Sequence, residues 1–394
     1  MTESTRQPIL VVGAGIAGVS AALEVAETGH EVLLVERDPS IGGRVLRSFQ
    51  YFPKFCPPSC GMEINIRRFV RNPRVRVMTN ARVVGATCRA QSWSVTISKA
   101  PAYVNDRCTA CGECSKVCPT KVADGFNLKL VEVPAIRPYH LHAWPRRYVL
   151  DRKACSTNCK ACVDACTYSA IDLAATEQQE TLEVSAVIVA TGWDPYPIER
   201  LSDLGGGVFP DVIANVMLER LASPSGPTGG KILRPSDRTP PKKVAFVQCA
   251  GSRDVNHLAY CSGVCCLDRR TPGRNEKLLT QASEVDGVKL VKGKVGRIER
   301  DDAGTLVLRV EDVESGRLLK ASADLVVLAT GMMPGVRTDW LPFALKKDDD
   351  GFAVDDPEQR VFVAGVTRRP EDVAASVRDA TGAAARALAA AFKE

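Results

Sequence analysis

The chain has 394 residues, of which 15 are cysteine and 45% are hydrophobic, and its formal net charge is +6. This length and apolar fraction predict two or three globular domains and exclude a disordered chain or a small disulfide scaffold. Met1–Pro8 lacks the apolar core of a secretory signal, and no apolar run approaches the ~18 residues of a membrane span. We therefore expect a cytoplasmic protein whose many reduced cysteines serve metal or redox chemistry. No basic stripe is interleaved with aromatic residues, so we expect no nucleic-acid partner.

The predicted elements alternate between strands and helices, which indicates an α/β fold. The first strand, Ile9–Val12, is an apolar run without alternation, as in the buried strands of a parallel sheet. A helix at Ala17–Thr28 and a strand at Glu31–Val35 complete a βαβ unit. The later elements are strands at Val184–Val189, Val244–Val247, Leu325–Leu328 and Val361–Ala364, and a helix at Val373–Phe392. The Pro-, Gly- and Ser-rich residues 223–243 predict a linker.

A glycine fingerprint joins the first strand to the first helix. Gly13, Gly15 and Gly18 have the G-x-G-x-x-G spacing, which permits a tight turn and brings a pyrophosphate close to the helix N-terminus. Glu36 ends the second strand, 18 residues after Gly18, where an acid bonds a ribose hydroxyl. The fingerprint therefore predicts a dinucleotide site.

Other segments resemble FAD flavoproteins that have two dinucleotide-binding domains. Ile41-Gly42-Gly43-Arg44 resembles the element that lies along the pyrophosphate in those proteins, and Ala190-Thr191-Gly192 resembles one of their strand ends. The resemblance implies FAD as a cofactor. It also implies contacts from these residues: Ile16, Ala17, Arg37, Val83, Gly365, Val366, Val373 and Ala374. The flavoproteins usually carry Asp in place of Val366, so another group must replace that contact with the ribityl chain.

Eight cysteines form two runs in a segment with a weak internal repeat. The first run, Cys108-x2-Cys111-x2-Cys114-x3-Cys118-Pro119, has the spacing of a bacterial ferredoxin, and the second is Cys155-x3-Cys159-x2-Cys162-x3-Cys166. In two-cluster ferredoxins the fourth cysteine ligates the other cluster. The predicted 4Fe–4S ligand sets are therefore Cys108, Cys111, Cys114 and Cys166, and Cys155, Cys159, Cys162 and Cys118. Zinc and structural thiols are the alternatives, although zinc usually takes C-x2-C pairs set further apart.

Four more cysteines, Cys249, Cys261, Cys265 and Cys266, follow the strand at Val244–Val247. They are either ligands of a third cluster, in a loop that folds back, or a redox pair beside buried thiols. In pyridine-nucleotide flavoproteins this strand leads into a second glycine turn, whereas here Cys249 takes the phosphate-binding position. We therefore expect this unit not to bind NAD(P)H.

Together these motifs resemble the heterodisulfide reductase family, in particular its flavin-containing A-type subunits and their relatives. The cluster motif of that family is similar to Gln248–Asp254 together with Tyr260–Cys266, and its flavin-contacting end is similar to Ala364-Gly365 together with Pro370–Val373. The resemblance implies a third 4Fe–4S cluster at this motif, in place of the NAD site. It also implies a thioredoxin-reductase-like fold, partner subunits and a homodimer. Family members from methanogens carry further domains at both ends, so this short form resembles the version from sulfur-oxidising bacteria.

The expected division of the chain follows from this resemblance. Residues 1–100 begin an FAD-binding domain, which residues 174–225 continue and residues 332–394 complete. Residues 101–173 form an inserted ferredoxin-like α+β module with two clusters. Residues 226–331 form a degenerate NAD-like domain that carries the further iron–sulfur site.

Three cysteines remain outside these motifs. Cys56 and Cys60 lie in a proline-containing Cys-x3-Cys loop and are a redox-active pair near the flavin, extra cluster ligands or a structural pair. Cys88 is expected to be a small buried apolar residue. The histidines have no metal-ligand spacing, and we expect His140 and His142 to pack at the surface.

The leading hypothesis is an oxidoreductase subunit that relays electrons between FAD, its clusters and partner subunits in thiol–disulfide or sulfur metabolism, such as sulfur oxidation. The helix that begins near Val373 would stabilise an anionic reduced flavin through its dipole. The alternatives are a stand-alone NAD(P)H-dependent iron–sulfur flavoprotein and a non-catalytic assembly scaffold. No catalytic acid or base stands out. Three oxidised clusters and FAD, at about −2 each, would change the charge from +6 to about −2.

Overall fold

The computed structural model describes residues 7–50, 56–89, 92–263, 284–337 and 340–392. These residues divide into two units. The first unit holds the described residues up to Trp193 and those from Pro334 onward, and the second holds Asp194–Met333. Strands β12 (Trp193–Pro195) and β19 (Met332–Pro334), which pair with each other, carry the chain across the two boundaries. The first unit is therefore discontinuous in sequence.

A parallel sheet forms the centre of the first unit. Its order is β20-β11-β1-β2-β3, and Ile9 of β1 lies opposite Ala186 on one side and Val32 on the other. The strands are β1 (Ile9–Val12), β2 (Val32–Val35), β3 (Val75–Met78), β11 (Ala186–Val189) and β20 (Val361–Val363). Every residue of β1, β2 and β11 is buried, which explains their apolar runs without alternation.

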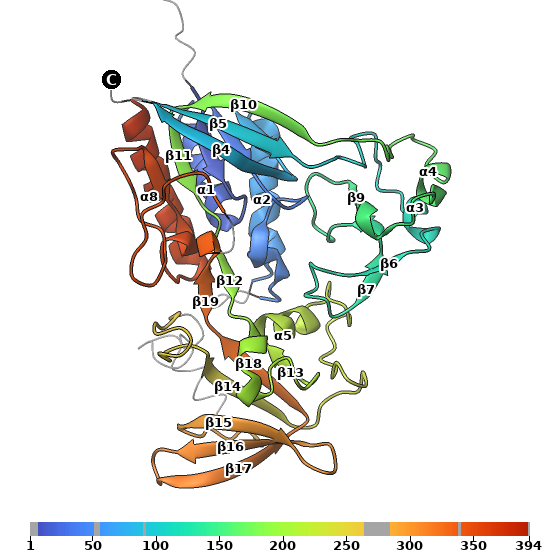
Figure 1. Cartoon of the computed structure of the whole chain (residues 1–394), viewed down its shortest axis with the longest axis vertical. Helices are drawn as coiled ribbons and strands as arrows, with labels where there is room; N and C mark the ends of the chain where they lie inside the picture. The colour runs from blue at the N-terminus through green and yellow to red at the C-terminus, as the bar shows by residue number, and fades with distance from the viewer. Residues whose placement is uncertain (1–6, 51–55, 90–91, 264–283, 338–339, 393–394) are drawn as a thin grey trace, which may run out of the picture. The chain divides into compact units, whose positions relative to one another are not determined.

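Two layers cover this sheet (Figure 1). Helices α1 and α8 contact each other and pack on the face that includes Ile9 and Val11. The antiparallel sheet β10-β5-β4 packs on the face that includes Leu10 and Val12. The bounds are α1 (Ile16–Glu27), α8 (Val373–Ala391), β4 (Ala81–Arg89), β5 (Ser92–Lys99) and β10 (Gln178–Val184). Successive residues of β1 therefore belong to two different cores, because side chains alternate across a strand.

The strand expected at Val184–Val189 is two strands in the structure. Val184 ends β10 in the antiparallel sheet, and β11 begins at Ala186 in the parallel sheet. At the break, the backbone N–H of Ser185 donates to the Pro8 carbonyl at 3.0 Å. The apolar run continues through the change of sheet, so the pattern of the sequence did not reveal it.

The inserted module of the first unit consists of short elements (Figure 1). They are α3 (Glu113–Lys116), α4 (Ala161–Asp164), the hairpin of β6 (Lys121–Ala123) and β7 (Glu132–Pro134), and the hairpin of β8 (Ile136–Pro138) and β9 (Tyr148–Leu150). Its small core contains Val104, Ile136, Cys114 and Cys162. So small a core contributes little stability, as is typical of small modules that a bound metal or cofactor stabilises.

The second unit contains a parallel sheet, β13-β18-β14, and an antiparallel sheet, β15-β16-β17. The bounds are β13 (Val212–Ala214), α5 (Asn215–Ala222), β14 (Val244–Ala250), β15 (Gly293–Arg300), β16 (Leu306–Asp312), β17 (Arg317–Ala323) and β18 (Leu325–Thr330). Residues 194–225 were expected to continue the FAD-binding domain. In the structure they lie in the second unit, because β13 pairs with β18 there.

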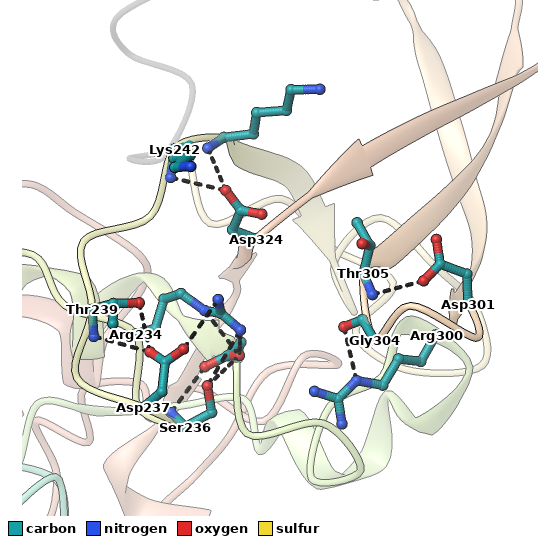
Figure 2. Close-up of polar contacts among 12 residues, drawn as sticks. Arg234, Ser236, Asp237, Thr239, Lys242, Arg300, Asp301, Gly304, Thr305 and Asp324 are labelled. Atoms are coloured by element: carbon teal, nitrogen blue, oxygen red, sulfur yellow. Dashed lines mark hydrogen bonds and ion pairs between the residues drawn. The ribbon is translucent and has the colours of Figure 1, made fainter.

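The predicted linker at residues 223–243 is tied to the second unit at several points (Figure 2). The buried Asp211 carboxylate pairs with Arg234 at 2.9 Å and accepts hydrogen bonds from the backbone and hydroxyl of Ser236 at 3.0 and 2.7 Å. Further along, the Asp324 carboxylate accepts a hydrogen bond from the backbone of Lys242 at 2.9 Å. The segment is therefore irregular in structure but held in place by its polar contacts.

We predict that Asp211→Ala loosens this segment. Removing one partner of a buried ion pair costs about 3 kcal/mol, because the remaining groups lose their counterion and hydrogen bonds. Limited proteolysis followed by mass spectrometry should then show faster cleavage within residues 223–243. Asp237→Ala is the matched control, since Asp237 is 44% exposed and bonds only locally to Thr239 and Arg234. Equal cleavage of the two variants would contradict the prediction.

Candidate functional site

The fingerprint glycines lie where β1 ends and α1 begins. The Gly13 N–H donates to the Val35 carbonyl at 2.8 Å, which fixes the turn beside the end of β2. A Cβ on Gly18 would lie 1.8 Å from the Gly13 carbonyl oxygen, so only glycine permits this approach of helix to turn. Gly15 is the N-cap of α1, Ile16 and Ala17 open the helix, and Ala17 is buried. The first turn of α1 therefore offers backbone N–H groups to an anion.

Glu36 follows β2 and faces this turn. Its Oε2 accepts a hydrogen bond from the Ala14 N–H at 2.6 Å, and its Oε1 accepts one from the Asp38 N–H at 2.8 Å. Burial raises the pKa of the Glu36 carboxyl to about 7, and the nearby Asp38 carboxylate adds to the rise. A buried acid beside the turn is suited to accept hydrogen bonds from ribose hydroxyls. Arg37, in contrast, is exposed.

The Gly42-Gly43-Arg44 element lies against the same turn. Gly42 forms a β-bridge with Gly15, and its N–H donates to the Ala14 carbonyl at 2.8 Å. The Arg44 Nε donates to the Trp193 carbonyl, and the guanidinium lies 5.1 Å from the centre of the Trp193 ring. The sequence pattern does not predict a role for Trp193, because this residue lies 149 positions further along the chain than Arg44.

The ends of β11 and β20 carry the remaining predicted flavin contacts. Ala190 is buried, and the Thr191 Oγ1 is buried without a hydrogen-bond partner among the described residues. The Gly192 N–H donates to Thr367 Oγ1 at 2.9 Å, and Thr367 was not predicted. Val83 is 3% exposed in the core beneath the sheet. The unpartnered Thr191 hydroxyl, the buried Glu36 carboxyl and the glycine turn lie at one edge of the sheet. This arrangement fits a bound dinucleotide.

The turn after β20 contains Gly365 and Val366, both buried. The Gly365 N–H donates to Asp379 Oδ2 of α8 at 2.8 Å, and Asp379 also pairs with Arg368 at 3.2 Å. Asp379 thus supplies a carboxylate to the turn that lacks the usual Asp. At the start of α8, Val373 is half-buried and Ala374 is exposed. The Asp372 side chain caps this helix by accepting from the Ala375 N–H at 2.6 Å.

We predict that FAD binds the FAD-free protein more tightly as the pH rises from 6 to 8. The Glu36 carboxyl, with a pKa of about 7, is protonated below this range, whereas ribose hydroxyls donate to its ionised form. The dissociation constant, measured by flavin fluorescence, should fall by up to about tenfold per pH unit below pH 7. Glu36→Gln should abolish this pH dependence, and Glu180→Gln, at an acid of β10 that pairs with Arg76, should preserve it.

The first three cysteines of the first run and the last cysteine of the second run surround one pocket. Cys108, Cys111, Cys114 and Cys166 line it, together with Tyr148. Burial raises the pKa of the Cys114 thiol to about 11, and the nearby Cys108 and Cys111 add to the rise. A buried thiol with three other thiols close by is a poor arrangement in water, whereas iron ions bind such groups as thiolates. The pocket therefore fits a cluster.

The other four cysteines also lie near one another. Burial raises the pKa of the Cys155 thiol, and the nearby thiols of Cys118 and Cys159 raise it further. Burial likewise raises the pKa of Cys162, again with added effects of Cys159 and Cys155. In the described part of the chain, no three His, Cys, Asp or Glu side chains are close enough to hold a single metal ion. A cubane differs, because each thiolate binds a separate iron atom.

We predict that paired substitutions will reveal which cysteines share a cluster. Cys108→Ala with Cys166→Ala should remove about four iron atoms per chain, because both residues line the same pocket. Cys155→Ala with Cys166→Ala should remove about eight, since it damages both sites. Iron analysis after anaerobic reconstitution gives the comparison. The reverse pattern would mean that each run binds its own cluster.

Two of the four later cysteines are described, and Cys265 and Cys266 lie outside the described residues. Cys249 is near the end of β14 with a φ of 56°, and Cys261 is exposed. The loop between them folds back, since the Arg253 N–H donates to the Tyr260 carbonyl at 3.1 Å. Gln248 Oε1 and Ser252 Oγ are buried with no hydrogen-bond partner in the described residues. A Cβ on Gly331 would lie 2.2 Å from this Ser252 hydroxyl, so a side chain at position 331 would clash with the loop.

The remaining cysteines, Cys56, Cys60 and Cys88, lie outside these groups. Cys60 is exposed in the first turn of α2 (Pro58–Arg71), and Cys56 is half-buried just before this helix. The expectation that Cys88 is buried is wrong. Cys88 is exposed, because it lies near the end of β4, an edge strand whose last residues extend past the core.

Comparisons with known protein families agree with this geometry. Residues 11–79 match an NAD(P)-binding Rossmann-like domain, and residues 101–123 match a 4Fe–4S binding domain. The chain is 34% identical, over 95% of its length, to the iron–sulfur A-type subunit of CoB–CoM heterodisulfide reductase from Methanocaldococcus jannaschii. It is 32% identical, over 96% of its length, to the A-type subunit of the H2:CoB–CoM heterodisulfide, ferredoxin reductase from Methanothermobacter marburgensis. It spans 63% of each of these relatives.

Solved structures confirm the thioredoxin-reductase-like fold. The thioredoxin reductase of T. acidophilum aligns over 98% of this chain and 99% of its own, with a TM-score of 0.52 and 13% identity. That of Lactococcus lactis aligns over 98% of this chain and 99% of its own, with a TM-score of 0.50 and 12% identity. Among the residues that the structure describes, no helix is both long and apolar enough to cross a membrane.

Proposed function

We propose that this chain, which is a homologue of the A-type subunits of heterodisulfide reductase, is the electron-transfer subunit of a heterodisulfide-reductase-like complex. The observation that carries this proposal is the presence of a dinucleotide turn and two groups of four cysteines in one structural unit. FAD accepts or donates one or two electrons and 4Fe–4S clusters exchange one at a time, so together they match two-electron donors to one-electron acceptors.

The residues of this chain have three tasks in such a relay. The glycine turn and Glu36 bind the dinucleotide, and Thr367 and Asp379 shape the turns beside the ends of β11 and β20. The eight module cysteines hold two clusters and shield them partly from water, which tunes their potentials. The Asp372 side chain caps α8, and its negative charge there would offset the stabilisation that the helix dipole could give to a negatively charged group of a bound flavin.

We infer that the second unit holds a third cluster rather than NAD(P)H. The end of β14 carries Cys249, where a nicotinamide-binding domain has a glycine turn. The buried, unpartnered Gln248 and Ser252 oxygens beside it, in the described part of the chain, support a bound group at this loop. Cys261 and the undescribed Cys265 and Cys266 complete the proposed ligand set.

The proposal also covers the partner subunits, the cellular location and the metabolic role of the protein. The chain spans a little less than two thirds of the length of its curated relatives, which are named as subunits of heterodisulfide reductase complexes. We propose that this chain likewise acts together with partner subunits. The proposed iron–sulfur sites, together with the exposed thiols of Cys60 and Cys88, support a reducing, cytoplasmic location. We further propose a homodimer, and a role in the thiol–disulfide chemistry of sulfur oxidation in which the partner subunits act on the sulfur substrate.

The anaerobically reconstituted protein should contain FAD and about 8–12 iron atoms per chain. An EPR-monitored titration should show that flavin and clusters are reduced reversibly, and NADH or NADPH alone should not bleach the flavin. Fewer than about 4 iron atoms per chain would contradict the assignment of several clusters. Rapid bleaching by NADH or NADPH would favour a stand-alone reductase, and redox-silent clusters would favour an assembly scaffold.

A further inference from the structure

The β8–β9 hairpin connects the cysteine core of the module to the flavin-binding part of the first unit. At one end, Ile136 of β8 is fully buried in the cluster of residues that contains Cys114 and Cys162. Its carbonyl accepts a hydrogen bond from Ser115 Oγ at 2.7 Å, next to Cys114. On β9, Tyr148 lines the pocket formed by the cysteines. The two strands of the hairpin therefore rest on the proposed cluster ligands.

The loop at the other end contacts the chain just before Gly42. The Trp144 carbonyl accepts a hydrogen bond from the Ile41 N–H at 3.1 Å, and the Trp144 N–H donates to Ser40 Oγ at 3.0 Å. Ser40 and Ile41 are 3% and 1% exposed. These two bonds hold the backbone immediately before the glycine pair that lies on the dinucleotide turn.

Further contacts surround this pair of bonds. The Arg47 guanidinium lies 5.3 Å from the centre of the buried Phe126 ring, which stacks on the His140 ring at 4.5 Å. Arg147 donates to the Thr79 hydroxyl at 3.3 Å, just after β3. His140 and Arg147 flank the loop at its two ends, so the loop is attached to the dinucleotide-binding region on both sides.

We propose that this hairpin couples iron loading of the module to FAD binding. A two-stranded hairpin of three-residue strands is not stable alone, so its position depends on the core around Ile136. Without iron, that core lacks the bonds that join its cysteines, the loop at residues 140–147 loosens, and Ser40 and Ile41 lose their partners. FAD then binds a less ordered Gly42-Gly43 element, and linkage requires that FAD in turn favours the iron-loaded state.

The test uses the full chain, with FAD removed, in an iron-loaded and an iron-free form under anaerobic reducing conditions. FAD is titrated into each form and binding is followed by flavin fluorescence. We expect the iron-free form to bind FAD about tenfold more weakly, within the usual range of coupling between sites. Charge alone predicts the opposite sign, because the clusters and FAD are both negative. Equal affinities, or tighter binding without iron, would overturn the proposal.

Ser40→Ala tests the route of the coupling. Without the hydroxyl, the Trp144 N–H loses its acceptor, so iron-loaded Ser40→Ala should bind FAD as weakly as the iron-free wild type, with unchanged iron content. Ser98→Ala removes a hydroxyl of β5 that bonds to Glu177, away from the hairpin, and should keep the tenfold ratio. If iron-loaded Ser40→Ala still binds FAD about tenfold more tightly than its iron-free form, this route is excluded.

A reciprocal measurement needs no variant and remains available if Ser40→Ala fails to fold. FAD should slow the loss of iron from the wild-type protein to a chelator, and the same loss rate with and without FAD would count against the coupling. Since only cofactor binding is measured, redox-silent clusters would refute the proposed relay but leave this coupling intact.

Discussion

Parallel pairing of β1 with β2 and β11 is the constraint on which the flavin site depends. Val12 lies opposite Val35 and Val189, so the residues that follow the three strands emerge at one edge of the sheet. That register puts the Glu36 carboxylate at the Ala14 N–H and leaves Ala190 in contact distance of the glycine turn. Ligands of open α/β sheets bind at this edge because the carboxyl ends of the strands meet there. The positions of the polar groups at this edge therefore depend on the burial of the apolar strands that lead to it.

The cysteine module has the opposite character, because little apolar burial supports it. Its strands have three residues and its two helices four, so few backbone contacts fix the thiols. Thiol burial also raises the pKa of Cys114, Cys155 and Cys162, which disfavours the thiolate form until iron is bound. The module contacts the sheet-based part of the unit through the β8–β9 hairpin and through aromatic side chains such as Phe126. This contrast makes the hairpin the natural place for one cofactor to affect the other.

Much of this architecture could be predicted from local patterns. The apolar runs of β1 and β2, the glycine spacing and the cysteine spacing each reflect a short-range constraint that the chain must satisfy in sequence. Contacts between distant segments left no such signal, as Trp193 with Arg44, Asp379 with Gly365 and Trp144 with Ser40 show. The break at Ser185 was hidden for a related reason, since the apolar run passes through it from one strand to the next. The prediction that Cys88 is buried was wrong, because the residue type does not show which end of an edge strand extends past the core.

The discontinuity of the first unit has a consequence for biosynthesis. Strand β20 and helix α8 complete the parallel sheet and cover α1, yet they follow the whole second unit in the chain. While the ribosome makes residues 194–333, the nascent first unit exposes the unpaired edge of β11 and the apolar face that α8 later buries. Such surfaces favour association between nascent chains. Slow translation or chaperone binding during this interval would therefore affect the yield of protein.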